Sequence, residues 1–170
     1  MVARGRRVIL RRKRMVDIQE DYAWRSDEEL TRLDASAPLR LSFSDYARNW
    51  NLDMRFTDTP TRYFAIEDEG GRRIGNVMFY NLNRSRAEAE VGISVGDRTA
   101  WGKGYGSDAM HTASRYFLER EGLKRLYLHT LESNVRAQKA FRRAGFVTSG
   151  VSWRDGQSFV VMELRPGAPG

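Results

Sequence analysis

The chain has 170 residues, 41% of them hydrophobic, which predicts one globular domain rather than two domains or a disordered chain. Cysteine is absent, which excludes disulfides, thiol nucleophiles and thiolate metal sites, and with only two histidines we expect no metal site. The formal net charge is +7, and only four of the 29 basic residues are lysines; a solvated arginine-rich surface is the simpler explanation, with phosphate-bearing or acidic partners as the alternative.

The N-terminal third predicts a strand followed by short helices. Its arginine-rich start lacks an apolar segment long enough for a signal peptide, and no run in the chain approaches the ~20 apolar residues that span a bilayer, so we expect a cytoplasmic protein without membrane contact. Ser26 is expected to cap the second helix, with Glu29 completing a capping box. The expected elements are a strand around 8–10 and amphipathic helices over 16–24, 26–33 and 42–54.

The rest of the chain alternates strands with two helices. A hairpin signal lies at 67–73, Gly122 is expected to cap a helix, and Asp155 and Gly156 are expected to turn the last hairpin. The expected strands cover 61–68, 72–82, 87–95 and 124–131, the helices run from the glycine loop to about Glu121 and over 134–145, and the hairpin spans 146–164. This order predicts a mixed α+β fold in one domain over 1–170, with a core over about 8–165 and a frayed tail, RPGAPG.

A glycine-rich loop, WGKGYG, precedes the first of these two helices. Its G-x-G-x-G spacing fits neither the dinucleotide fingerprint nor the P-loop. Glycines at the start of a helix let backbone N–H groups converge on an anion, which the helix dipole also favours. The loop therefore indicates either a diphosphate cradle or a flexible strand-to-helix turn.

Three segments in order, namely the strand over 87–95, the loop and the helix over 134–145, resemble the GNAT superfamily of acetyl-CoA-dependent N-acetyltransferases. The resemblance covers about residues 8–165 and points to the RimJ/RimL-type branch of ribosomal-protein N-terminal and spermidine acetyltransferases. Residues similar to the family signatures Q/R-x-x-G-x-G/A and N-x-x-A-x-x-x-Y-x-x-x-G-F are Trp101, Gly102, Lys103, Gly104, Tyr105 and Gly106 in the loop, and Asn134, Ala137, Phe141, Gly145 and Phe146 in the helix.

The resemblance implies a twisted, mainly antiparallel sheet whose central strands, 87–95 and 124–131, splay apart and are flanked by helices. The unpaired backbone groups of Ile93, Ser94 and Val95 would then bind the pantetheine arm of acetyl-CoA. Its pyrophosphate would reach the amides of Lys103 to Ser107, and Asn134 would both cap a helix and contact the pantetheine. A homodimer is kept as an open alternative for the assembly of the chain.

Two residues depart from the family pattern. Trp101 stands where Gln or Arg is usual, which removes one polar group but keeps the backbone cradle. Phe141 stands where many members have a tyrosine that protonates the departing thiol. A thiol has an unperturbed pKa of about 8.5, so coenzyme A can leave as a thiolate, and we expect Phe141 to pack beside the cofactor arm.

A base for the acceptor amine is expected on the strand over 87–95. Glu88 and Glu90 lie on one face of it by two-residue alternation, and by motif position Glu90 is the better match to the family's strand carboxylate. The alternative is that both glutamates face solvent or pair with arginines. His129, without a visible partner, is interpreted as a packed core residue rather than a base.

The expected reaction is acetyl transfer from acetyl-CoA to a primary amine, such as a protein N-terminus or a polyamine. By the resemblance, Trp24, Glu28, Glu29 and Trp153 would frame the acceptor groove, although the acids could equally serve a helix N-terminus. Two alternatives remain: a non-catalytic acyl-CoA sensor, suggested by Phe141, and an arginine-rich nucleic-acid-binding module, for which no reading motif is present.

Overall fold

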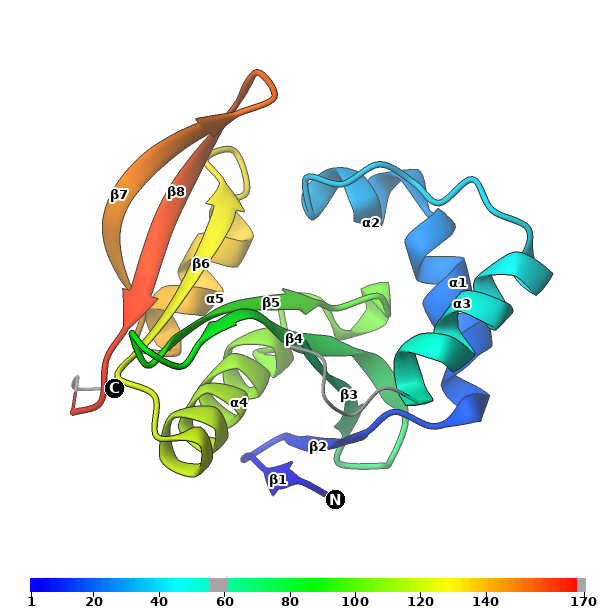
Figure 1. Cartoon of the computed structure of the whole chain (residues 1–170), viewed down its shortest axis with the longest axis horizontal. Coiled ribbons are helices and arrows are strands. Elements are labelled where there is room, and N and C mark those ends of the chain that lie inside the picture. Colours follow the sequence, from blue (N-terminus) through cyan, green and yellow to red (C-terminus); the bar gives the residue numbers. More distant parts are fainter. Residues whose placement is uncertain (56–60, 168–170) are drawn as a thin grey trace.

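The computed structural model describes residues 1–55 and 61–167, and the side chains of all of these except 51–55. Within them the chain forms five α-helices and one eight-stranded sheet (Figure 1). None of the described helices combines the length and the apolar character that crossing a membrane requires. The elements are β1 (Ala3–Arg4), β2 (Val8–Arg12), α1 (Ile18–Ser26), α2 (Glu28–Leu33), α3 (Phe43–Arg55), β3 (Arg62–Asp68), β4 (Arg73–Asn83), β5 (Glu88–Ser94), α4 (Tyr105–Glu121), β6 (Arg125–Leu131), α5 (Val135–Arg143), β7 (Val147–Arg154) and β8 (Gln157–Leu164).

The sheet divides between β5 and β6. Its strand order is β1-β2-β3-β4-β5-β6-β8-β7, and β5–β6 is the parallel pair in an otherwise antiparallel sheet. This parallel pairing ends at Glu90 and Tyr127, although β5 stays paired with β4 as far as Ser94 and β6 with β8 as far as Leu131. The two halves of the sheet therefore form a fork, which confirms the expected splay (Figure 1).

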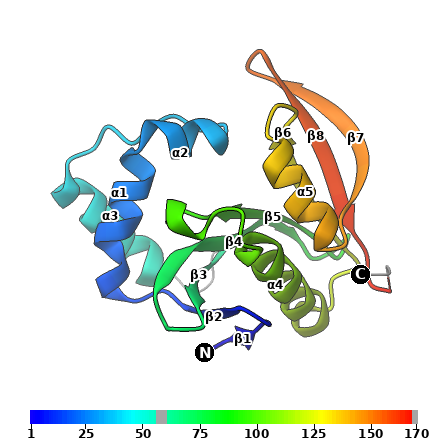
Figure 2. The same ribbon diagram turned by 180° about the vertical axis from the view of Figure 1, so that it is seen from behind.

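Helix α4 covers one face of the sheet and α5 lies on the same side (Figure 2). Phe117 of α4 stacks on Phe79 of β4, with ring centroids 3.9 Å apart and planes 4° from parallel. Ala89 and Val91 of β5 are buried in the same core. Because side chains alternate along a strand, Glu90 points to the opposite face.

The N-terminus forms a hairpin that the sequence did not predict. The Asp108 carboxylate in the first turn of α4 accepts the backbone N–H groups of Arg6, Arg7 and Val8 at 3.2, 2.7 and 3.1 Å. At Gly5, between β1 and β2, a Cβ atom would lie 2.4 Å from the Thr112 hydroxyl, so the hairpin can approach α4 this closely only through glycine. These contacts fix the hairpin to the helix that starts at the glycine loop.

The predicted elements are confirmed in order, but one cap is wrong. Ser26 is the last residue of α1, and Asp27 caps α2 by accepting the N–H of Leu30 at 2.9 Å. Both residue types suit this position, and Asp27 takes it because its extended backbone ends one helix and begins the next. Gly122 ends α4 as expected, and Asp155 and Gly156, with φ of 50° and 75°, turn the last hairpin. Of the expected frayed tail, 168–170 lie outside the described residues.

Buried charges attach α1 to the sheet. Arg11 of β2 binds both Asp17 oxygens at 2.8 Å, and Arg73 of β4 donates to the Asp17 carbonyl at 2.9 Å and to the Asp21 carboxylate. Lys13 also donates to Asp21, and burial lowers the pKa of Lys13 to about 8 although Asp21 opposes the shift. Each of these side chains is at most 6% exposed. The position of the N-terminal helices therefore depends on charge pairing.

Replacing Arg73 with methionine should destabilise the protein by about 3 kcal/mol or more, because Asp17 and Asp21 would lose a buried cationic partner. The matched control is Arg115→Met, which removes an exposed arginine paired with Glu119 and should cost less than about 1 kcal/mol. Urea unfolding of the two variants measures both values. Equal, small losses would show that the buried charges are not coupled as described.

Candidate active site

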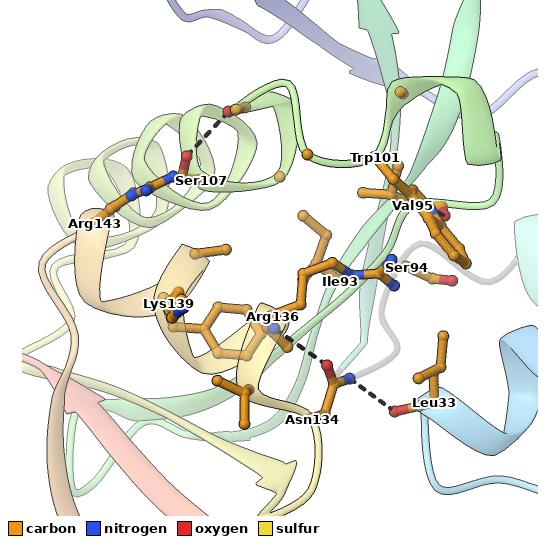
Figure 3. Close-up of a pocket in the computed structure, with 18 of the residues that line it drawn as sticks. Leu33, Ile93, Ser94, Val95, Trp101, Ser107, Asn134, Arg136, Lys139 and Arg143 are labelled. Atoms are coloured by element: carbon orange, nitrogen blue, oxygen red, sulfur yellow. Dashed lines mark hydrogen bonds between the residues drawn. The ribbon is translucent and has the colours of Figure 1, made fainter.

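The fork opens a cleft of about 390 Å³ between β5, the glycine loop, α5 and the end of α2 (Figure 3). Ile93, Ser94 and Val95, which the resemblance assigned to the pantetheine arm, line it from β5 and the residue after it, and their contact with the arm stays a prediction. Of the other residues expected to bind the cofactor, those on the cleft wall are Trp101, Gly102, Gly104, Gly106, Ser107, Asn134, Ala137 and Phe141. Lys103 and Tyr105 belong to the same loop but are not part of this wall.

The glycine loop has the backbone conformation that its composition predicts. Gly102 and Gly104 have φ of 74° and 86°, a region that side chains disfavour. Helix α4 begins at Tyr105, so the N–H groups of its first turn have no partner within the helix. A Cβ atom at Gly102 would meet no atom within 4 Å, and one at Gly104 would come only near Arg7, at 3.9 Å. The loop thus presents open space and a favourable dipole to an anion.

Trp101 contributes more to the cleft than the sequence suggested. Its indole N–H donates to the carbonyl of Val95 at 2.7 Å, which satisfies one backbone group at the end of β5. The Arg136 guanidinium of α5 lies 3.7 Å from the centre of a Trp101 ring. Trp101 is therefore a polar partner of the strand and a contact surface for the helix across the cleft.

Asn134 holds the other side of the cleft. Its carbonyl oxygen accepts the N–H of Ala137 at 3.1 Å, which confirms its expected role as cap of α5. Its amide N–H donates to the carbonyl of Leu33 at 3.3 Å, so the side chain connects α5 with the end of α2 (Figure 3). The expected pantetheine contact of Asn134 stays a prediction. Phe141, 8% exposed, lines the cleft beside it and packs against Phe146.

The two candidate bases have different environments. Glu88 pairs with Arg125 at 2.9 Å and with Arg86 at 3.8 Å, which agrees with the alternative that the glutamates pair with arginines. Glu90 is 5% exposed and pairs with no arginine whose side chain the structure describes; it lies at the base of the fork, outside the residues that line the cleft. One of its oxygens is 2.7 Å from His129 Nδ1, and the other accepts the Asn81 amide at 2.9 Å.

His129 has partners that its sequence context did not reveal. Besides Glu90, which is 39 positions away, it contacts Arg154 through Nε2. Tyr80 lies directly opposite Glu90 on β4, and burial followed by the Glu90 charge raises the pKa of Tyr80. A polar network therefore surrounds Glu90 on the face opposite α4.

The four residues expected at the acceptor groove do not come together. Glu29, with Asp27, is bound by Arg98 at 2.8 to 2.9 Å, and Glu28 is exposed beside Arg40. Trp24 packs against Gly96, whose Cβ would lie 2.1 Å from the indole, and against Arg73. Trp153 is 72% exposed near the tip of the β7–β8 hairpin, which lies across the fork from α2 (Figure 1).

Asp34 lines the cleft and was not identified from the sequence. The residue is exposed on the cleft wall, near Ser94. Desolvation by the surrounding protein raises the pKa of Asp34 to about 6, against the opposite effects of Ser94 and Arg25. No motif marks the position, since it simply follows α2. Among the described residues no group of three His, Asp or Glu side chains is placed to hold a metal ion.

Comparison with known proteins assigns the family. The family model described as an acetyltransferase (GNAT) domain matches residues 7–147, which is most of the chain. This protein belongs to the GNAT acetyltransferase family. It is therefore an N-acetyltransferase that uses acetyl-CoA, as the resemblance implied. The N-acetyltransferase p20 of Bacillus licheniformis is 24% identical over 150 residues, covering 85% of this chain and 82% of that protein.

Solved structures have the same fold as this GNAT chain. The spermidine N-acetyltransferase of Vibrio cholerae, in complex with CoA and spermine, has a TM-score of 0.84 at 22% identity and covers 95% of this chain and 96% of its own. A GNAT-family acetyltransferase of Bacillus anthracis has a TM-score of 0.78 at 15% identity, with 96% and 97% covered.

The cleft of this GNAT protein fits coenzyme A on its own chemistry. The open space beside Gly102 and Gly104, together with the free helix amides, suits a pyrophosphate, and Lys139 and Arg143 add positive charge to the wall. At Ile93 to Val95, beyond the fork, the edge of β5 that faced β6 is no longer paired with it. An extended chain bearing amides could hydrogen-bond there.

Gly104→Val should weaken acetyl-CoA binding by more than about tenfold, because a branched side chain cannot adopt the left-handed backbone that aims the loop amides. Gly156→Val is the matched control, since Gly156 also has a positive φ, at 75°, but lies at the tip of the last hairpin. It should lose similar stability and keep wild-type affinity in calorimetric titration. Equal affinity of both variants for acetyl-CoA would refute the cradle.

Proposed function

We propose that this protein transfers the acetyl group of acetyl-CoA directly to a primary amine, such as a protein N-terminus, a polyamine or another small amine, with Glu90 assisting deprotonation. The observation that carries the proposal is the position of Glu90, a buried carboxylate at the base of the fork. Bound acetyl-CoA would supply the acetyl group as a reactive thioester. Direct transfer is supported by the absence of cysteine, which removes the thiol nucleophile.

The two ends of the cleft would have separate tasks. The loop amides of 103–107 would hold the diphosphate, and the backbone of 93–95 together with Asn134 would hold the pantetheine amides. Phe141 would pack beside this arm, and its lack of a hydroxyl is tolerable because a thiol with a pKa of about 8.5 can leave as the thiolate. The remaining alternative, a non-catalytic acyl-CoA sensor, rests on that missing hydroxyl and predicts binding without turnover.

Glu90 would act on the incoming amine. An α-amino group with a pKa near 8 needs less help than a side-chain amine near 10.4, and in both cases the ammonium must lose a proton before it attacks. A carboxylate at the fork can orient the ammonium and accept this proton directly or through water. Glu88 is the weaker candidate because Arg125 already binds it at 2.9 Å.

Recognition of a cationic acceptor would fall to few carboxylates. The Vibrio cholerae neighbour was solved with the polycation spermine, but here Asp27 and Glu29 are neutralised by Arg98. Asp34 lies on the cleft wall and Glu90 at the base of the fork. A screen of α-amines, polyamines and short peptides with detection of released thiol identifies the acceptor, and turnover separates the enzyme from the sensor.

Glu90→Gln should preserve the fold and acetyl-CoA affinity but lower turnover near neutral pH by about 10²–10⁴-fold, the usual range for general-base help. The deficit should shrink at high pH because the amine then deprotonates unaided. Glu88→Gln is the matched control on the same face of β5 and should retain near-wild-type turnover. Asp34→Asn should keep kcat and raise only the KM for a cationic amine, since Asp34 would help to bind the acceptor and not remove its proton.

A pH–rate profile of each variant with the best amine of the screen decides the assignment. If the Glu90→Gln profile coincides with the wild type, Glu90 has no role in proton removal. A selective loss in Asp34→Asn would then transfer the role to the carboxyl group whose pKa is already raised to about 6.

A further inference from the structure

His129 occupies the space where β5 and β6 separate, and it bridges the two halves of the sheet. Its Nδ1 is 2.7 Å from Glu90 on β5, and its Nε2 contacts the Arg154 guanidinium at the end of β7. The imidazole ring lies edge-on to Tyr127, with centroids 6.0 Å apart. The side chain is 16% exposed and that of Glu90 7%, so water competes little for these contacts.

The donors and acceptors of this chain fix the tautomer of His129. A guanidinium can only donate, so Nε2 must accept from Arg154 and carries no proton. In the neutral ring the proton is then on Nδ1, which donates to the Glu90 carboxylate. Both ring nitrogens are thereby occupied, and His129 has no free lone pair with which to take a proton from Glu90.

Glu90 is held from its other side by a strained residue. Asn81 donates to the second carboxylate oxygen at 2.9 Å, and its backbone has φ of 52°, a left-handed conformation uncommon outside glycine. It lies in a bulge of β4 between Tyr80 and Asn83, opposite the β5 segment that contains Glu90. A bulge of this kind redirects a side chain, and local strain is retained where the surroundings require it.

We propose that His129, locked by Arg154 as the Nδ1–H tautomer, is a positioning residue that fixes one oxygen of Glu90 while Asn81 fixes the other. This role of His129 rests on the proposed function, in which Glu90 receives the proton of the amine. His129 itself neither touches the acceptor nor carries the proton. Since Arg154 comes from the β7–β8 hairpin, the orientation of Glu90 would depend on both halves of the fork.

The tautomer is testable without any turnover. The chain has two histidines, and His111, exposed on α4, serves as the internal reference. Nitrogen-15 NMR of the imidazole rings near neutral pH should show His129 protonated at Nδ1 and unprotonated at Nε2. A ring protonated at Nε2 alone, or at both nitrogens, would overturn the proposal whatever the protein acetylates.

Kinetics test the consequence for Glu90. His129→Leu should lower kcat by about 10²-fold, the cost of a small misplacement of a reacting group, with acetyl-CoA affinity unchanged. His129→Asn should restore most of kcat because its amide N–H can replace Nδ1–H. Arg154→Leu should lower kcat less than His129→Leu, since the donor to Glu90 remains. His111→Leu is the control and should behave as the wild type.

The outcomes separate the two claims. Wild-type kcat in His129→Leu, in a protein that acetylates an amine, would overturn the positioning role and leave the proposed function intact. Equal losses of kcat in His129→Leu and His129→Asn would also overturn it. They would show that a hydrogen-bond donor to Glu90 at this position makes no difference and that His129 has only a packing role. A wild type that acetylates no amine would instead refute the proposed function, and the NMR measurement would still decide the tautomer.

Discussion

The end of pairing between β5 and β6 at Glu90 and Tyr127 is the constraint on which the site depends. Beyond this point β5 keeps its partner on one side and loses it on the other, so the backbone of 93–95 faces a cleft instead of a strand. The α4 crossover that makes the pairing parallel also brings the glycine loop to the same end of the cleft. A cofactor site and a buried carboxylate therefore result from one interruption in a ladder of hydrogen bonds.

Arginine side chains stabilise this arrangement at several places. Part of the net charge of +7 therefore belongs to residues with structural contacts and not only to a solvated surface. Arg73 holds α1 through buried carboxylates, and Arg98 binds the acids at the start of α2. Arg136 stacks on Trp101 across the cleft, and Arg154 reaches His129 at the fork. The planar guanidinium suits each role because it stacks on rings and donates in several directions at once.

Local features were predictable from the sequence and long-range ones were not. The glycine loop, the cap at Asn134 and the turn at Asp155 follow from backbone preferences of nearby residues, so their signals are contained in a few positions. The contact between Glu90 and His129 depends on where two strands separate, which no spacing in the sequence encodes. The residues expected at the acceptor groove do not lie together for a similar reason. Glu29 is bound by Arg98, which is 69 positions away in the sequence. The shift of the cap from Ser26 to Asp27 shows that adjacent cap formers are resolved only by the backbone.

Residue-resolved amide hydrogen exchange, with and without acetyl-CoA, tests most directly whether the fork is the cofactor site. On addition of acetyl-CoA, exchange should slow at the amides of 103–107 and at those of 93–95 whose N–H groups point into the cleft rather than toward β4, because these groups would gain hydrogen-bond partners. The hairpin tip at Asp155 and the exposed face of α1 should keep their rates. Protection confined to other elements, or no change at 93–95 and 103–107 under saturating acetyl-CoA, would contradict the assignment of the site.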